Sequence, residues 1–236
     1  NRCTFAWPSF QSDKTGRYRR GLLSDPWRDN VMSVPSHGTQ RNTGSQPPVP
    51  RRLFHFVAGS IVPIAGIFLP EDFMVAGLAV LLAGGLGLEM ARFKVVWLNQ
   101  RLVRWFAPLL KADENRRITG ATYMVLAALM AFLLFDTAVA VAALLFLSFG
   151  DPTAALVGRR MRGPRLFGKS PVGTAAFFLV SLAVAAVLVG GAGFPYHWGF
   201  LVGAAVAALV ELASLPPDDN LTIPIAAGAA MRLLGV

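Results

Sequence analysis

Four clusters of charged and polar residues in this 236-residue chain have the side-chain types that phosphate chemistry requires. The first cluster is Arg51-Arg52-Leu53-Phe54-His55. On a helix Arg51 and His55 share a face because they are four residues apart, so a guanidinium and an imidazole could bind one phosphate together. Anchoring at the level of lipid headgroups is the alternative for the two arginines. It does not explain His55, which lies one turn into an apolar segment.

The second cluster surrounds Asp151. Asp151 followed by Pro152 is a good helix start, with Asp151 as the N-cap; alternatively, a helix that begins near residue 137 continues through Pro152 to about residue 161. Asp151 could hold Mg²⁺ beside Arg159 and Arg160. The metal ion and the arginines together would neutralise the charge of a nucleoside triphosphate and of its transition state. The whole cluster reads Gly150-Asp151-Pro152-Thr153-Ala154-Ala155 and then Gly158-Arg159-Arg160.

The third cluster, residues 163–170, matches the G-x-x-x-x-G-K-S pattern of a phosphate-binding loop. That loop joins a buried strand to a helix so that backbone N–H groups surround the phosphates. Residues 151–162 show no strand pattern, and Pro171 removes an N–H where the helix should begin. We therefore do not expect a phosphate-loop fold, but we expect Lys169 to act as a flexible cation near a bound phosphate.

The fourth cluster is Asp218-Asp219-Asn220, which precedes the last apolar segment. These side chains could cap a helix, but two carboxylates exceed what capping needs. With Asp151 they are candidate Mg²⁺ ligands. Glu89 and Arg92 are predicted to form an ion pair that orders the end of a helix, and Glu211 is expected near the same face.

Composition predicts how these clusters are positioned. Of all residues 54% are hydrophobic and only 15% are charged, which is too little polar surface for a soluble domain of this size. The chain is therefore predicted to be an all-α, polytopic integral membrane protein with about seven transmembrane helices. Stretches dense in small residues, at 83–85, 199–203 and 226–228, are expected to pack closely against other helices. The expected spans are 53–70, 73–91, 118–135, 137–150, 172–192, 197–214 and 221–236.

The distribution of Lys and Arg predicts the orientation of these spans. Alternate polar stretches hold nine, seven and five of the 22 basic residues, whereas the stretches between them hold none. The positive-inside rule then places the N-terminus and all four clusters on the cytoplasmic side. A net charge of +9 is explained by these loops, so we do not expect nucleic acid as a partner. With one cysteine, Cys3, neither a disulfide framework nor a cysteine-based metal site is expected.

Residues 1–50 differ in kind from the rest of the chain. They are rich in Arg, Ser, Pro, Gln and Asn and show no apolar periodicity, so we predict a disordered basic segment. Met32 is a possible true start of the protein. Residues 51–236 are predicted to form the transmembrane domain.

The motifs together resemble the family of CTP-dependent lipid kinases that contains dolichol kinase, phytol kinase and the fungal diacylglycerol kinase. The resemblance covers about residues 50–236, and the family more often has Arg-Lys where this chain has Arg51-Arg52. The matching segments are Arg51-Arg52 to His55, Thr119-Gly120-Ala121-Thr122-Tyr123, Gly150 to Ala155 with Gly158-Arg159, Gly168-Lys169-Ser170 with Gly173-Thr174, and Asp218 to Pro224.

The resemblance implies transfer of the γ-phosphate of a nucleotide, usually CTP and alternatively ATP, to the hydroxyl of a membrane lipid alcohol, with Mg²⁺ as cofactor. The residues it implies fall into three sets: catalytic Asp151, Arg51, Arg52 and His55; nucleotide-binding Thr153, Gly158, Arg159, Arg160 and Lys169; and metal-binding Asp151, Asp218, Asp219 and Asn220. A phosphatidate cytidylyltransferase is the nearest alternative because it also uses CTP at a membrane. A small-molecule transporter is the second, although a transporter should carry ionisable residues in the middle of its spans.

Overall fold

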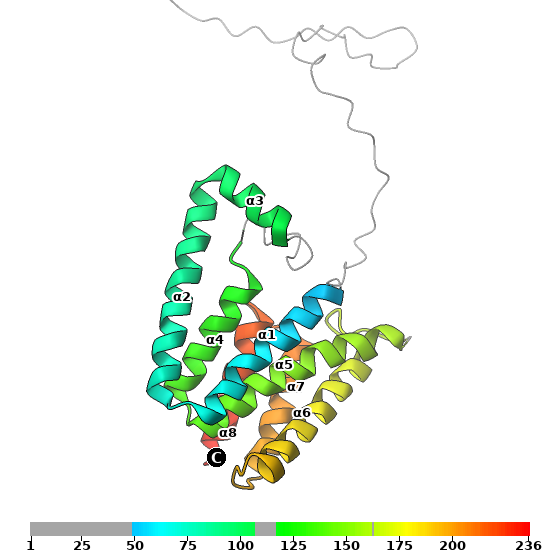
Figure 1. The fold of residues 1–236 in the computed structure, drawn as a ribbon. Helices are drawn as coiled ribbons and strands as arrows, with labels where there is room; N and C mark the ends of the chain where they lie inside the picture. The colour runs from blue at the N-terminus through cyan, green and yellow to red at the C-terminus, as the bar shows by residue number, and fades with distance from the viewer. Residues whose placement is uncertain (1–48, 107–116, 162) are drawn as a thin grey trace, which may run out of the picture. The chain divides into compact units, whose positions relative to one another are not determined.

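The computed structural model describes residues 49–106, 117–161 and 163–236, and every regular element in these ranges is an α-helix (Figure 1). The predicted all-α class is thereby confirmed. The prediction for residues 1–50 falls almost wholly outside the described ranges, as do the side chains of Arg51 and Arg52. In order, the helices are α1 (Val49–Phe68), α2 (Glu71–Lys94), α3 (Val96–Phe106), α4 (Gly120–Leu134), α5 (Thr137–Arg160), α6 (Pro171–Gly191), α7 (Gly199–Ala213) and α8 (Asp219–Leu233).

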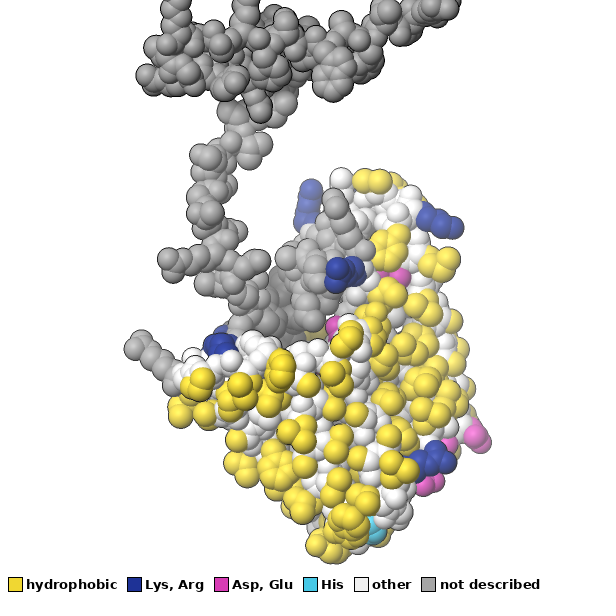
Figure 2. Space-filling view, turned by 180° about the vertical axis from the view of Figure 1, so that it is seen from behind, with side chains coloured by type: hydrophobic (Ala, Val, Ile, Leu, Met, Phe, Trp, Pro, Cys, Tyr) yellow, Lys and Arg dark blue, Asp and Glu magenta, His cyan; other side chains and the backbone are white. Residues whose placement is uncertain are grey.

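Three of these helices, α2, α5 and α6, are long and apolar enough to cross a membrane. Three shorter apolar helices cover Leu53–Phe68, Gly120–Leu134 and Gly199–Ala213. At a rise of 1.5 Å per residue a 15-residue helix such as α4 is only about 22 Å long, which is shorter than the ~30 Å hydrocarbon core. Seven full spans are thus not confirmed, and the chain is helical with several membrane-compatible helices. Figure 2 shows apolar side chains over the body of one face, with charged ones gathered toward its two ends.

Helix α5 is the centre of the arrangement. It packs against α1, α4, α6, α7 and α8, and 67% of its most apolar 18-residue stretch is buried inside the protein. It runs without a break through Pro152, so the predicted stop at Gly150 is wrong and the alternative of one continuous helix is right. Asp151 therefore lies inside a helix and not at its N-cap, which removes the capping explanation for its carboxylate.

Close packing of the helices depends on some of the predicted small residues and not on others. A Cβ on Gly203 would approach Met231 to 2.5 Å, so α7 and α8 need a glycine there. Outside the predicted stretches, a Cβ on Gly150 would lie 2.6 Å from the Phe177 ring on α6. Gly84, however, has nothing within 4 Å of its Cβ position, because it lies on the exposed side of α2. The prediction of close packing is wrong for this residue.

Helix α3 was not predicted, since the basic segment between the expected spans 73–91 and 118–135 was expected to be a polar connection. It is only 11 residues long and amphipathic. Trp97, Arg101 and Trp105 follow each other at intervals of four, and the Arg101 guanidinium lies 6.0 and 5.9 Å from the two indole rings. Both tryptophans are exposed, as in helices that lie in a membrane interface.

Candidate functional site

Lys169 joins three separate parts of the chain at one end of the helices. It lies in the turn between α5 and α6, and its Nζ is 2.7 Å from Oδ2 of Asp219 and 3.0 Å from Oε1 of Glu211. Asp219 is the first residue of α8, and Glu211 is near the end of α7. The other oxygen of Glu211 accepts a hydrogen bond from Thr174 of α6, at 3.2 Å. One ammonium group thus holds together carboxylates from two helices.

The charge state of Lys169 follows from these neighbours. Burial alone would lower the pKa of the Lys169 ammonium, but the negative charges of Asp219 and Glu211 outweigh it and raise the pKa above its ordinary value. Lys169 is therefore a cation at neutral pH. A ligand that displaces Lys169 from Asp219 and Glu211 would therefore contact a positively charged ammonium group.

Asp151 adds a third carboxylate to this group. Its half-buried side chain is close enough for its charge to act on both Glu211 and Asp219. Three carboxylates and one ammonium leave a local excess of negative charge. Such an excess at the end of an apolar bundle is a reason to expect a cation among the ligands.

The turn that carries Lys169 is a tight hairpin and not a phosphate-binding loop, as expected. The backbone N–H groups of Leu166 and Lys169 donate to each other's carbonyls at 2.9 and 2.8 Å, so they do not point into an anion site. Phe167 and Gly168 between them both have positive φ, 50° and 84°, as in a type I′ turn. Helix α6 then begins at Pro171. The turn positions the Lys169 side chain.

The four predicted metal ligands are not assembled into one site. Asp218 caps α8 by accepting from the Asn220 N–H at 3.0 Å, and the Asn220 amide donates to the Gly120 carbonyl on α4 at 3.2 Å. Asp219 is paired with Lys169. In the part of the chain that the structure describes, no group of three or more His, Cys, Asp or Glu side chains could hold a metal by itself. Of the four predicted ligands, Asp151 and Asp219 are close enough for the charge of one to act on the other.

The predicted nucleotide-binding residues at the end of α5 have mixed surroundings. Arg159 and Arg160 are exposed in the last turn. The Thr153 hydroxyl donates to the Phe149 carbonyl at 2.7 Å within the helix. Gly158 is buried, and a Cβ there would lie 3.0 Å from Ser170, so its close approach is to the start of α6. The two arginines remain available to a ligand, whereas Gly158 has a packing role.

The first cluster lies beside α5. Helix α1 packs on α5 with the Phe56 and Phe149 rings 4.7 Å apart, and a Cβ on Gly59 would meet Ser148 at 2.7 Å. A Cβ on Gly66, later in α1, would meet Val141, earlier in α5, at 3.4 Å, so the two helices run antiparallel and the start of α1 lies toward the end of α5. Arg51 and Arg52 are therefore in the α1 turn at the same end as Arg159, and the structure does not describe their side chains.

Glu89 and Arg92 form the predicted ion pair, which is buried. Arg92 Nε is 2.5 Å from Glu89 Oε2, and the two side chains are only 4% and 7% exposed. The other Glu89 oxygen accepts from the Thr119 N–H at 2.9 Å, the Thr119 hydroxyl at 2.8 Å and the Thr122 hydroxyl at 3.1 Å. Arg92 also donates to the Arg117 carbonyl. The pair thus fixes the end of α2 to the start of α4.

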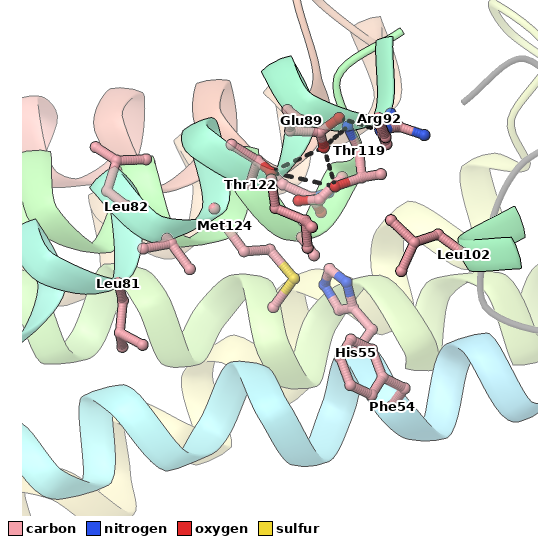
Figure 3. A pocket seen from close by; sticks show the side chains of 16 residues that line it. Phe54, His55, Leu81, Leu82, Glu89, Arg92, Leu102, Thr119, Thr122 and Met124 are labelled. Carbon is pink, nitrogen blue, oxygen red and sulfur yellow. Dashed lines mark hydrogen bonds and ion pairs between the residues drawn. The ribbon is translucent and has the colours of Figure 1, made fainter. Parts of the chain in front are cut away.

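This pair lies at the wall of a cavity of about 290 Å³ between α1, α2, α3 and α4. His55 points across it from α1 toward Thr119 and Thr122, with Met124 beside it (Figure 3). Asn220 also lines the cavity. His55 therefore belongs to this cavity, and Lys169 with its carboxylates forms a second group. Helix α8 connects the two, because Asn220 lines the cavity and the adjacent Asp219 contacts Lys169.

Two features of the site were not predicted. The first is the ion pair between Lys169 and Glu211. Glu211 was expected near this face, but the two residues are 42 apart in sequence and nothing in either segment indicates that they pair. The bonds from Thr119 and Thr122 to Glu89 had a weak signal, because both threonines lie in one of the motifs that carry the resemblance.

Comparison with known proteins gives one relative of note. An uncharacterized protein of Rickettsia prowazekii, RP860, is 25% identical over 181 residues, which cover 74% of this chain and 88% of that protein. No family model matches the chain. No solved structure matches it significantly.

Proposed function

We propose that this protein is a membrane lipid kinase that transfers the γ-phosphate of a nucleotide, CTP by the resemblance, to the hydroxyl of a lipid alcohol of the diacylglycerol, polyprenol or phytol type. The observation that carries the proposal is the contact of Lys169 with Asp219 and Glu211, beside Asp151. It supplies a phosphate-binding cation and acidic Mg²⁺ ligands at the end of an apolar helix bundle. We propose that this end faces the cytoplasm, where the nucleotide is, because the basic loops surround it.

The residues present fit a magnesium–nucleotide complex better than an isolated metal ion. Mg²⁺ in nucleotide enzymes is usually held by one or two carboxylates together with substrate phosphates and water, so a complete protein cage is not needed. Asp219 and Glu211 would hold the ion, which neutralises charge on the phosphates. Lys169, displaced from these carboxylates, would bind the phosphates, and Arg159 and Arg160 would attract the incoming nucleotide.

In the proposed reaction the lipid hydroxyl oxygen forms a bond to the γ-phosphorus. The bond between that phosphorus and the oxygen bridging to the β-phosphate breaks, and the nucleoside diphosphate leaves with the electron pair. The hydroxyl proton passes to the Asp151 carboxylate. Asp151 is suited to this role because it is half-buried, lies inside a helix and has no capping duty.

The test is to incubate the purified protein with γ-labelled CTP or ATP, Mg²⁺ and a panel of lipid alcohols. Label in a lipid product is expected, and label in none of them would refute the kinase proposal. A parallel reaction with α-labelled CTP and phosphatidate separates the alternative enzyme, since label retained in lipid would mean cytidylyl transfer. Uptake of a labelled solute into proteoliposomes without any lipid product would favour a transporter.

A further inference from the structure

The cavity beside Glu89 and Arg92 has the two-part character of a site for an amphiphile. Most of its lining is apolar, from Phe54 on α1 through Leu81 and Leu88 on α2 to Leu102 on α3. One end is polar, with the Glu89–Arg92 pair and the hydroxyls that bind it. Its volume of about 290 Å³ is at the small end for ligand pockets, so it suits a head group with the first part of one chain.

The polar end is rigid and offers donors. Both Glu89 oxygens are already acceptors in hydrogen bonds, from Arg92 on one side and from Thr119 and Thr122 on the other. Glu89 therefore acts as a support that fixes the Arg92 guanidinium at the wall. A guanidinium has five N–H donors; among the described residues, Nε of Arg92 donates to Glu89 and Nη2 donates to the Arg117 carbonyl. The chemistry of this end suits a head group with oxygen acceptors.

The cavity also reaches the surface that faces lipid. Leu81 and Leu88 line it and are still 60% and 49% exposed. They lie on α2, a membrane-compatible helix whose most apolar 18-residue stretch is only 17% buried. An amphiphile could thus enter from the bilayer beside α2 without crossing water.

We infer that this cavity is the acceptor site, which binds the glycerol or allylic head of a lipid alcohol against Arg92 and Thr119, with its chain along Leu81 and Leu88. The inference rests on the proposed kinase function for the word acceptor, but the binding of a lipid alcohol can be measured without it. The cavity lies next to the phosphate-binding group because Asn220 lines it while Asp219 contacts Lys169. A head group in the cavity would therefore lie beside Asn220, and the adjacent residue of α8, Asp219, contacts Lys169.

Two neighbouring glycines on α2 allow a matched test. Gly85 lines the cavity, and the nearest atom to its Cβ position is the Thr122 hydroxyl at 4.0 Å, so a large side chain fills the cavity before it strikes the fold. Gly84 does not line it and has open space around it. Gly85→Phe and Gly84→Phe thus make the same change in the same helix, one inside the cavity and one outside.

The probe is a diacylglycerol with a diazirine on one acyl chain, photolysed with the full-length protein in nanodiscs, with a diazirine-bearing polyprenol as a second probe. Peptide mapping should place the adduct on α2 or α4 around the cavity, and excess unlabelled lipid alcohol should remove it. Gly85→Phe should weaken labelling by about tenfold or more, since it displaces at least two methylene groups of the ligand, whereas Gly84→Phe should leave it unchanged. Gly85→Leu, with thermal unfolding of each variant, controls for a folding defect.

The possible results separate the cavity from the kinase. Labelling that maps elsewhere, or that both phenylalanine variants affect equally, overturns the cavity assignment even if lipid phosphorylation occurs. Labelling that maps to the cavity and disappears only in the Gly85 variants supports the assignment even if no phosphate is transferred. In an active preparation, the Gly85 variants should raise the KM for lipid more than the KM for nucleotide.

Discussion

Replacing Lys169 by Met tests whether the ion pairs at the end of the helices hold the structure together. The substitution keeps the length of the side chain and removes its charge, which leaves Asp219 and Glu211 facing each other with Asp151 nearby. Breaking a fully buried pair costs about 3–5 kcal/mol, and an exposed pair contributes about 0–1 kcal/mol. Because the Lys169 side chain is 24% exposed, we expect an intermediate loss of about 2–3 kcal/mol in the free energy of unfolding.

The assay is thermal unfolding in detergent micelles, followed by the fluorescence of the five tryptophans. A loss of this size corresponds to a midpoint lower by about 4–12 °C for a domain of this length. Lys94→Met is the matched control, since it makes the same change at an exposed lysine at the end of α2, where we expect less than about 0.5 kcal/mol.

The same ion pairs also predict how the stability difference between wild type and Lys169→Met changes with pH. The pKa of Lys169 is raised above its ordinary value of 10.5, so its contribution to stability is fully present below pH 10.5 and is lost as the pH rises through the higher pKa of the folded protein. The difference between wild type and Lys169→Met should therefore be constant from neutral pH to about pH 10 and should shrink above it. A variant as stable as the wild type at neutral pH, or a difference that persists unchanged at high pH, would refute the assignment of these ion pairs.

Three further changes test other parts of the molecule. Asp151→Asn should abolish lipid phosphorylation without lowering the unfolding midpoint, because it removes a repulsive charge and changes little volume; near-normal turnover would remove Asp151 from the mechanism. Gly150→Ala should cost about 1–3 kcal/mol against the ring on α6, while Gly84→Ala in open space should stabilise α2 by up to about 1 kcal/mol, both measured by thermal unfolding. A double-mutant cycle with Glu89→Gln and Arg92→Met should give a coupling energy above about 1 kcal/mol, and additive effects would argue against the buried pair.

The sequence predicted most of the helices but not all of their ends. Long apolar stretches identify α2 and α6 because lipid and buried core both require such residues. The end of α5 was left open, since a proline can start a helix or lie inside one, and only packing against five other helices decides between these. Helix α3 was missed because a short segment with a low apolar content has no span signal, although the spacing of Trp97, Arg101 and Trp105 is helical.

The candidate site was predicted in its parts but not in its pairings. Counting alternate spans placed Asp219 on the same side as Lys169, and the structure brings these two into contact. Counting cannot give the partner of a side chain, however, so four ligands were assigned to one metal ion. The backbone geometry at the start of α8 instead turns Asp218 into a cap and directs Asn220 toward α4.

The first turn of α8 has a thermodynamic consequence. Asp219 is paired with Lys169, and Asn220 donates to the Gly120 carbonyl beside the cavity. A ligand that shifts this turn at one of these two sites therefore changes the geometry of the other site. Linkage is reciprocal, so on the proposed function any factor by which a lipid alcohol changes nucleotide affinity is also the factor by which the nucleotide changes lipid affinity. Titrating CTP with and without diacylglycerol in the nanodisc measures this factor, and a value of one would show that the two halves of the turn respond independently.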